Sequence, residues 1–162
     1  MSSGILEAVV DSSSLMCILK QEVACQLFET ELAKTSTLYM SAVTVAEVRL
    51  AAMAAKGTPG LNLMNHLIEL LNIKIIDFTA SDLNDYQNAA TKYHLKAKRP
   101  GPLNMGDIFS FVLAQQMNLP LYFQGLDFLQ TPVKNAMAIL GYQMSADNRG
   151  VPCIEPKIQG EA

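Results

Sequence analysis

Histidine is scarce in this sequence: His66 and His94 are its only two examples, and they lie far apart. Zinc hydrolases and Ser-His triads both need imidazole side chains, so the sequence gives little support to either kind of site. The three cysteines, at positions 17, 25 and 153, are odd in number and lack the spacing of a metal site. We expect them to be reduced thiols. Any catalytic chemistry must therefore come from carboxylates.

Charged residues and long apolar runs are also few. Asp, Glu, Lys and Arg together make up 17% of the 162 residues, the formal net charge is −3, and half of the chain is hydrophobic. A net negative charge argues against a broad nucleic-acid-binding face, although it leaves a local basic patch open. No apolar run approaches the roughly 18–20 residues of a membrane span, and the N-terminus lacks the basic start of a secretory signal. We therefore expect a cytoplasmic protein with no membrane partner.

The length is enough for one domain with a substantial core, which we assign to residues 1–145. Residues 146–162 form a polar C-terminal tail in this assignment, and we expect the part from Asp147 onward to be loose. The stretch from Ala136 to Met144 fits either a last strand or a last helix.

Strand-like and helical segments alternate along the chain. Alternation of this kind indicates a parallel sheet covered on both faces, so the expected fold class is α/β. Gly57-Thr58-Pro59-Gly60 divides one helical stretch, from about Val45 to Leu71, into a helical hairpin. The short apolar runs with the character of buried strands are residues 8–10, 38–40, 73–76 and 121–123.

Four acids stand where such a sheet would bring them together. Asp11, Glu47 and Asp127 each follow a predicted strand, and Asp107 opens the helix that Asn104 is placed to cap. Asp107 lies three residues after this N-cap, where its carboxylate can accept from the free backbone donors of the helix start. In open parallel sheets, ligands bind in the crevice beyond the carboxyl ends of the strands. We therefore expect the four acids to converge at one rim of the sheet.

Carboxylates gathered at one rim repel one another, and a hard divalent cation would neutralise them. Mg²⁺ and Mn²⁺ prefer oxygen ligands and often retain water. A metal of this kind can bind a scissile phosphate, lower the pKa of a water molecule and offset charge on the leaving oxygen, so phosphodiester hydrolysis needs no histidine. Ser13 and Thr131 carry hydroxyl groups that could orient such a water or a carboxylate, although hydroxyls at helix starts and turns are ordinary.

Each acid also has an ordinary structural explanation. Asp11 suits a helix N-cap, Glu47 suits a capping box that Thr44 begins, and Asp107 suits a first helical turn. Asp127 suits a turn. Four basic residues ahead of Asp107 could attract a phosphate backbone or simply form a solvated loop; they are Lys92, Lys96, Lys98 and Arg99.

Four blocks of the sequence resemble, in order and spacing, the motifs of the PIN-domain family, and most of all those of VapC-type toxins from bacterial toxin–antitoxin pairs. The resemblance extends from about Ile5 to Thr131. It implies an α/β/α sandwich with a central, mainly parallel sheet, an endoribonuclease dependent on Mg²⁺ (with Mn²⁺ as an alternative), and an antitoxin that covers the site. The blocks are Val9-Val10-Asp11-Ser12-Ser13-Ser14-Leu15, Ser41-Ala42-Val43-Thr44-Val45-Ala46-Glu47, Leu103-Asn104-Met105-Gly106-Asp107 and Gly125-Leu126-Asp127-Phe128-Leu129-Gln130-Thr131.

Carried over by motif, the resemblance implies that Asp11 and Asp107 are the principal metal ligands. Glu47 and Asp127 would complete the catalytic cluster, with Asp127 as a further metal ligand. Asn104 and Thr131 would support the acids, as Ser13 would. Two positions depart from the family pattern: Leu126 stands where members often have another acid or Asn, and Pro132 stands where they often have an acid.

We therefore expect a metal-dependent endoribonuclease that hydrolyses RNA and acts as the toxin of a toxin–antitoxin pair. The alternative is a catalytically silent PIN-like module that binds RNA or protein, but retention of all four acids speaks against it. A phosphatase with Asp11 as nucleophile would commonly need an acid two residues later, where this chain has Ser13.

The expected partners are an RNA substrate, a cognate antitoxin and a second copy of the chain in a homodimer. An antitoxin would pair an Arg or Lys with the acids and lay an apolar helix in a neighbouring groove. The candidate groove lies on the helical hairpin. Its apolar side chains, which also suit core packing, are Met53, Leu63, Met64 and Leu67. The sequence does not identify the RNA target or the antitoxin.

Overall fold

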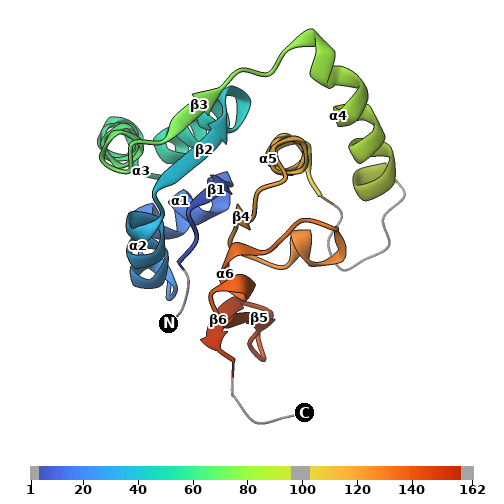
Figure 1. Ribbon diagram of the computed structural model, residues 1–162. Coiled ribbons are helices and arrows are strands. Elements are labelled where there is room, and N and C mark those ends of the chain that lie inside the picture. The colour runs from blue at the N-terminus through green and yellow to red at the C-terminus, as the bar shows by residue number, and fades with distance from the viewer. Residues whose placement is uncertain (1–3, 96–102, 158–162) are drawn as a thin grey trace.

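A four-stranded parallel sheet forms the centre of the protein (Figure 1). The computed structural model describes residues 4–95 and 103–157. The strand order is β3-β2-β1-β4, so the chain runs outward from β1 to β3 and then returns to the other side of β1. This confirms the α/β class and the four predicted strands. Their bounds are β1 Glu7–Val10, β2 Thr37–Ser41, β3 Lys74–Ile76 and β4 Leu121–Tyr122.

Helices cover both faces of the sheet, as predicted, and side chains alternate between two apolar clusters. Ala8 and Val10 of β1 pack into one cluster with α1, α2 and α3, whereas Val9 packs into the other with α4 and α5. Figure 1 shows α4 and α5 across the strands from α2 and α3. The helices are α1 Ser12–Lys20, α2 Cys25–Lys34, α3 Ala42–Leu70, α4 Leu83–Ala90, α5 Met105–Met117 and α6 Ala136–Ile139, with short turns η1 Ala80–Asp82, η2 Thr91–Leu95 and η3 Asp127–Gln130.

The predicted helical hairpin is confirmed within α3, which consists of two helical segments joined at Lys56 and Gly57. Gly57 has φ +63°, a conformation that side chains with a Cβ rarely adopt, so the glycine permits the reversal. Arg49 Nε donates to Asn65 Oδ1 at 2.8 Å and ties the two segments together. None of the helices in the described part of the chain is long and apolar enough to cross a bilayer.

The C-terminal region contains an antiparallel hairpin of β5 (Tyr142–Ala146) and β6 (Pro152–Pro156). The expectation of a loose terminus from Asp147 onward is therefore wrong for β6. Tyr142, Met144 and Ile154 pack against the apolar cluster that also holds Ala8 and Val10, and this tertiary contact orders the hairpin. The expected domain boundary after residue 145 falls inside this hairpin and stays a prediction.

Candidate active site at the carboxyl end of β1

Asp11 follows β1 directly, at the position where the strand order reverses between β1 and β4. Its backbone N–H donates to Tyr122 O at 2.9 Å, which continues the pairing of β1 with β4 by one residue. The side chain is only 1% exposed. The crevice at such a reversal is where open parallel sheets bind their ligands, so the sheet places Asp11 at the predicted rim.

Only one oxygen of the Asp11 carboxylate has a hydrogen-bond partner. Oδ2 accepts from Ser13 N at 3.0 Å and from Ser13 Oγ at 2.6 Å, and Ser13 Oγ accepts from Gln124 N at 3.0 Å. Asp11 is therefore the N-cap of α1, and Ser13 fixes the orientation of its carboxylate. Oδ1, by contrast, is buried without a partner. Capping alone does not explain an oxygen left in this state, because a buried unpaired acceptor costs free energy.

Asp107 lies in the first turn of α5, and the predicted capping box with Asn104 is confirmed. Asn104 N donates to Asp107 Oδ2 at 2.8 Å, and Asp107 N donates to Asn104 Oδ1 at 2.9 Å. Asp107 is 7% exposed, whereas Asn104 is exposed. Asn104 thus supports the second buried acid through its backbone and side chain.

Glu47 does not take part in a capping box with Thr44, so that expectation is wrong. The N-cap of α3 is Ser41, whose Oγ accepts from Val43 N at 3.3 Å, and α3 begins three residues earlier than the Thr44 pattern predicts. Thr44 is buried and shares a 3.3 Å hydrogen bond with Ser110 of α5. Glu47 therefore lies beyond the first turn, with its Oε2 buried and without a hydrogen-bond partner.

Gly106 makes room for the Glu47 carboxylate, a role that the sequence did not reveal. A Cβ at position 106 would overlap Glu47 Oε1 and lie 2.6 Å from Oε2. Any side chain there would have to displace Glu47, since Cβ atoms do not approach other atoms this closely. The one hint in the sequence is a glycine in the first turn of a helix, where it lowers helix propensity.

Asp127 is the first residue of the short helical turn η3, and Thr131 follows its last residue. Asp127 is exposed, whereas the other three acids are buried or half-buried. Thr131 Oγ1 donates to Phe128 O at 2.7 Å and accepts from Val133 N at 3.4 Å, so these bonds hold the backbone after η3. The supporting role of Thr131 toward the acids stays a prediction.

The four acids act on one another electrostatically, and the two ion pairs of the described residues, Glu31–Lys34 and Asp147–Arg149, involve none of them. Burial raises the pKa of Asp107 to about 7, and the negative charges of Asp11, Asp127 and Glu47 add to this effect, while the Asn104 N–H opposes it. Burial and the Asp11 charge also raise the pKa of Glu47, against a lowering by the Ser12 side chain. Partial desolvation of its carboxylate, followed by the Asp11 charge, raises the pKa of Asp127. Asp11 is thus within electrostatic range of the other three acids, and their role in one common site stays a prediction.

The donor set suits a hard divalent cation. All four side chains offer carboxylate oxygens, and Asp11 Oδ1 and Glu47 Oε2 are buried oxygens that a cation would satisfy. Within residues 4–95 and 103–157, no three His, Cys, Asp or Glu side chains are grouped to hold one ion. Mg²⁺ does not require three, since it commonly binds through one or two carboxylates and keeps several waters. The residues present therefore fit a cation held by the buried acids.

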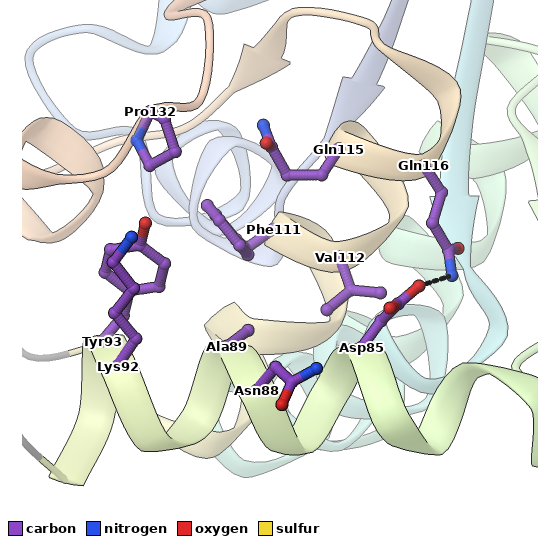
Figure 2. Close-up of a pocket in the computed structure, with 10 residues that line it drawn as sticks. All are labelled: Asp85, Asn88, Ala89, Lys92, Tyr93, Phe111, Val112, Gln115, Gln116 and Pro132. Carbon is purple, nitrogen blue, oxygen red and sulfur yellow. Dashed lines mark hydrogen bonds between the residues drawn. The ribbon is translucent and has the colours of Figure 1, made fainter.

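A separate cavity of about 470 Å³ lies between α4 and α5 (Figure 2). Its walls include Tyr93 and Lys92 on one side and Phe111 on the other, and Gln116 Nε2 donates to Asp85 Oδ2 at 3.0 Å along its edge. None of the described residues that line it is one of the four acids. Lys92, the first residue of the predicted basic cluster, lies here, whereas Lys96, Lys98 and Arg99 fall outside the described residues.

Comparison with known proteins identifies the family of the chain. The PIN domain family matches residues 8–134. Ribonuclease VapC30 of Mycobacterium tuberculosis is 30% identical over 125 residues, which cover 77% of this chain and 95% of the relative.

Two solved structures share the fold. The crystal structure of Mycobacterium tuberculosis VapC20, described as a sarcin-ricin loop cleaving toxin, has a TM-score of 0.65 at 12% identity and covers 78% of this chain and 95% of its own. A toxin–antitoxin complex from Klebsiella pneumoniae has a TM-score of 0.56 at 17% identity, with coverages of 77% and 92%. The family match spans residues 8–134 and VapC30 is 30% identical, so the chain belongs to the PIN domain family, among its VapC-type members.

Proposed function

We propose that this protein is a divalent-metal-dependent endoribonuclease and the toxin of a toxin–antitoxin pair. The observation that carries the proposal is that Asp11 and Asp107 are buried within electrostatic range of each other and of Glu47, with one oxygen each of Asp11 and Glu47 buried and unpaired. The family supports the same activity, because relatives such as VapC30 are named ribonucleases. A catalytically silent binding module would gain nothing from keeping carboxylates that repel one another.

Asp11 and Asp107 are the residues that would hold the cation, as the two most buried acids of the cluster. When bound, Mg²⁺ or Mn²⁺ would position the scissile phosphate and lower the pKa of a water. Ser13 donates to Oδ2 of Asp11 and leaves its Oδ1 without a partner, and the Asn104 N–H donates to Oδ2 of Asp107. Gly106 lets Glu47 approach these two acids.

Asp127 has a different place in the proposed reaction. Hydrolysis of a phosphodiester consumes one water and leaves a phosphomonoester and a hydroxyl group, so a proton must be moved at the site. Asp127 is exposed and its pKa is raised, which suits a carboxylate that takes up a proton from the attacking water and returns it, through solvent, to the leaving oxygen. Its direct contact with the metal stays a prediction.

Removal of the metal tests this proposal. Purified protein should cleave single-stranded or loop RNA with Mg²⁺ or Mn²⁺, lose the activity in excess EDTA and regain it when Mg²⁺ is restored, because the acids alone cannot bind the phosphate. The measurement is RNA fragmentation on a denaturing gel. Common contaminating ribonucleases need no metal, so cleavage that persists in EDTA would contradict the proposal.

The surface of the α3 hairpin supports an antitoxin as the partner. Leu50 and Leu70 are 71% and 70% exposed, and of the predicted side chains Met53 and Leu63 are exposed, Leu67 is half-buried and Met64 is buried in the core. An apolar groove of about 480 Å³ runs beside this hairpin; Ile18, Leu32, Leu67, Leu70 and Leu71 are among its lining residues. Such a groove suits the apolar face of a helix. An Arg or Lys of the same partner protein would form ion pairs with the acids.

Expression in a bacterial host tests the partner. The chain alone should arrest growth, and co-expression of a small protein encoded beside its gene should relieve the arrest and yield a co-purifying complex. Replacing Leu70 with Asp should weaken that complex while leaving RNA cleavage intact. Tolerance of the active wild type at high expression would instead indicate a housekeeping nuclease. The homodimer that the sequence predicts stays a prediction, which light scattering of the purified chain checks.

A further inference from the structure

A second cleft opens beside the acids, on the side of α1 and the C-terminal hairpin. It has a volume of about 480 Å³, within the range of about 300–1,000 Å³ that small-molecule sites occupy. Met16 of α1, Val23, and the hairpin residues Val151 and Pro152 give it apolar walls. Lys20, Glu22 and Gln124 add polar groups.

Two lining residues connect this cleft to the acid cluster. Ser13 lines it, and its Oγ donates to Asp11 Oδ2 at 2.6 Å. Gly125 also lines it, and a Cβ at that position would lie 3.9 Å from Asp127 Oδ2. The cleft therefore adjoins Asp11 and Asp127.

The outer wall of the cleft belongs to the hairpin β5–β6, which lies beyond the family match at residues 8–134. The hairpin is fixed to the core through Tyr142, Met144 and Ile154. Its turn is also fixed, because Asp147 Oδ1 accepts from Arg149 N at 2.8 Å and from Val151 N at 2.9 Å. Val151 and Pro152 are thus held in place against α1.

We propose that this cleft binds the base of a nucleotide next to the scissile phosphate, and that the C-terminal hairpin sets the base preference of cleavage. This inference rests on the proposed endoribonuclease function. Single-stranded RNA is recognised through bases that leave the stack and enter pockets where they make apolar and hydrogen-bonding contacts. The apolar walls suit the faces of a base, and Lys20, Glu22 and Gln124 suit its polar edge.

The lining favours a base over the other parts of RNA. A phosphate would meet Glu22 and the neighbouring carboxylates with one cation, Lys20, to offset them. A base is neutral, so it avoids this repulsion. The nucleosides on either side of the phosphate must lie beside the acids in any productive complex, and the cleft adjoins the acids directly.

Two matched variants test the inference. Val151 and Leu129 are both 46% exposed, and Asp at either position adds one negative charge near the acids, but only Val151 lines the cleft. Val151→Asp should weaken binding of single-stranded RNA at least tenfold and change the base preferred at one position beside the cut. Leu129→Asp should change affinity less than threefold and keep the preference. Affinity is measured by fluorescence anisotropy in an Asp107→Asn background, and preference by sequencing the ends cleaved from a randomised RNA pool.

The two measurements separate this inference from the function on which it rests. If wild type cleaves RNA and Val151→Asp keeps both affinity and base preference, the cleft is not a base site and the inference fails alone. Equal losses in both variants would show general charge repulsion and would also overturn it. If wild type does not cleave RNA, the proposed function fails, and the binding measurement still decides whether the cleft holds RNA. A Val151→Asp variant that loses only the antitoxin complex would assign the cleft to protein.

Discussion

Replacing Asp107 with Asn should abolish RNA cleavage while leaving the fold intact. The two side chains have the same shape, and the Asn oxygen can still accept from Asn104 N, the bond that Asp107 Oδ2 accepts at 2.8 Å. The change removes a buried negative charge that would hold the cation. Losing about 4 kcal/mol of transition-state stabilisation corresponds to about a thousandfold in rate. We therefore expect the rate to fall at least that far, measured on a fluorescent RNA at saturating Mg²⁺.

The matched control is Asp85→Asn, which changes an exposed acid outside the cluster. Asp85 Oδ2 accepts from Gln116 Nε2 at 3.0 Å, and Asn keeps an oxygen for that bond. This variant should cleave RNA within about twofold of wild type, in keeping with the small effect of most surface substitutions. A full rate in Asp107→Asn would show that Asp107 is only a capping residue, as its place in the first turn of α5 would otherwise allow.

The features that the sequence predicted correctly are those specified by neighbouring residues. The Asn104–Asp107 capping box depends on two residues three positions apart at the start of one helix, and the structure contains both of its hydrogen bonds. The parallel sheet follows from alternating segments, because few arrangements bury four apolar strands. The expectation that Asp11 and Asp127 lie at the same rim came from their positions after two strands of that sheet.

The role of Glu47 could not be predicted from its neighbours. Ser41 and Thr44 are both suitable N-caps, and the Thr44–Glu47 spacing fits a capping box as well as any. The contact of Thr44 with Ser110 in α5, 66 residues away in sequence, buries Thr44 and leaves Ser41 as the N-cap of α3. With Ser41 as the cap, Glu47 is left for the acid cluster. The sequence carries no local signal of that distant packing.

Gly106 and the C-terminal hairpin were missed for the same physical reason. A glycine in a helix start shows where a side chain is lacking, but the Glu47 carboxylate that fills the space comes from another helix. The hairpin lies in a polar stretch without a strong strand pattern, and contacts of Tyr142, Met144 and Ile154 with the core stabilise it. Tertiary contacts decide both features.

The metal-free protein should lose stability as the pH rises, because the pKa of Asp107 is raised by folding. The pKa in the folded protein is about 7, against an ordinary value of 3.8, and burial is the main cause. Between these values the unfolded chain has released the proton that the folded protein still holds, so a rising pH favours unfolding. The stabilising effect of the bound proton is complete below about pH 4 and lost above about pH 7.

The expected loss of unfolding free energy is large enough to measure by urea unfolding. At 1.36 kcal/mol for each pKa unit, the wild type should lose about 3 kcal/mol of unfolding free energy between about pH 5 and pH 8 relative to Asp107→Asn. Urea unfolding in EDTA at the two pH values measures it, and the difference from the Asn variant removes titrations that both proteins share. Glu47 and Asp127 also have raised pKa values, so their contributions have the same sign.

Mg²⁺ should offset the loss of stability at high pH, because it binds the deprotonated carboxylates. At a concentration about 100 times its dissociation constant, a ligand adds about 2.7 kcal/mol, so the gain should be largest at pH 8 in the wild type and much smaller in Asp107→Asn. The change of unfolding free energy with pH and its change with Mg²⁺ together distinguish a metal-binding acid from a buried capping acid. If metal-free wild type is instead more stable at pH 8 than at pH 5, relative to the Asn variant, then Asp107 is ionised in the folded protein and its charge is already compensated by other groups.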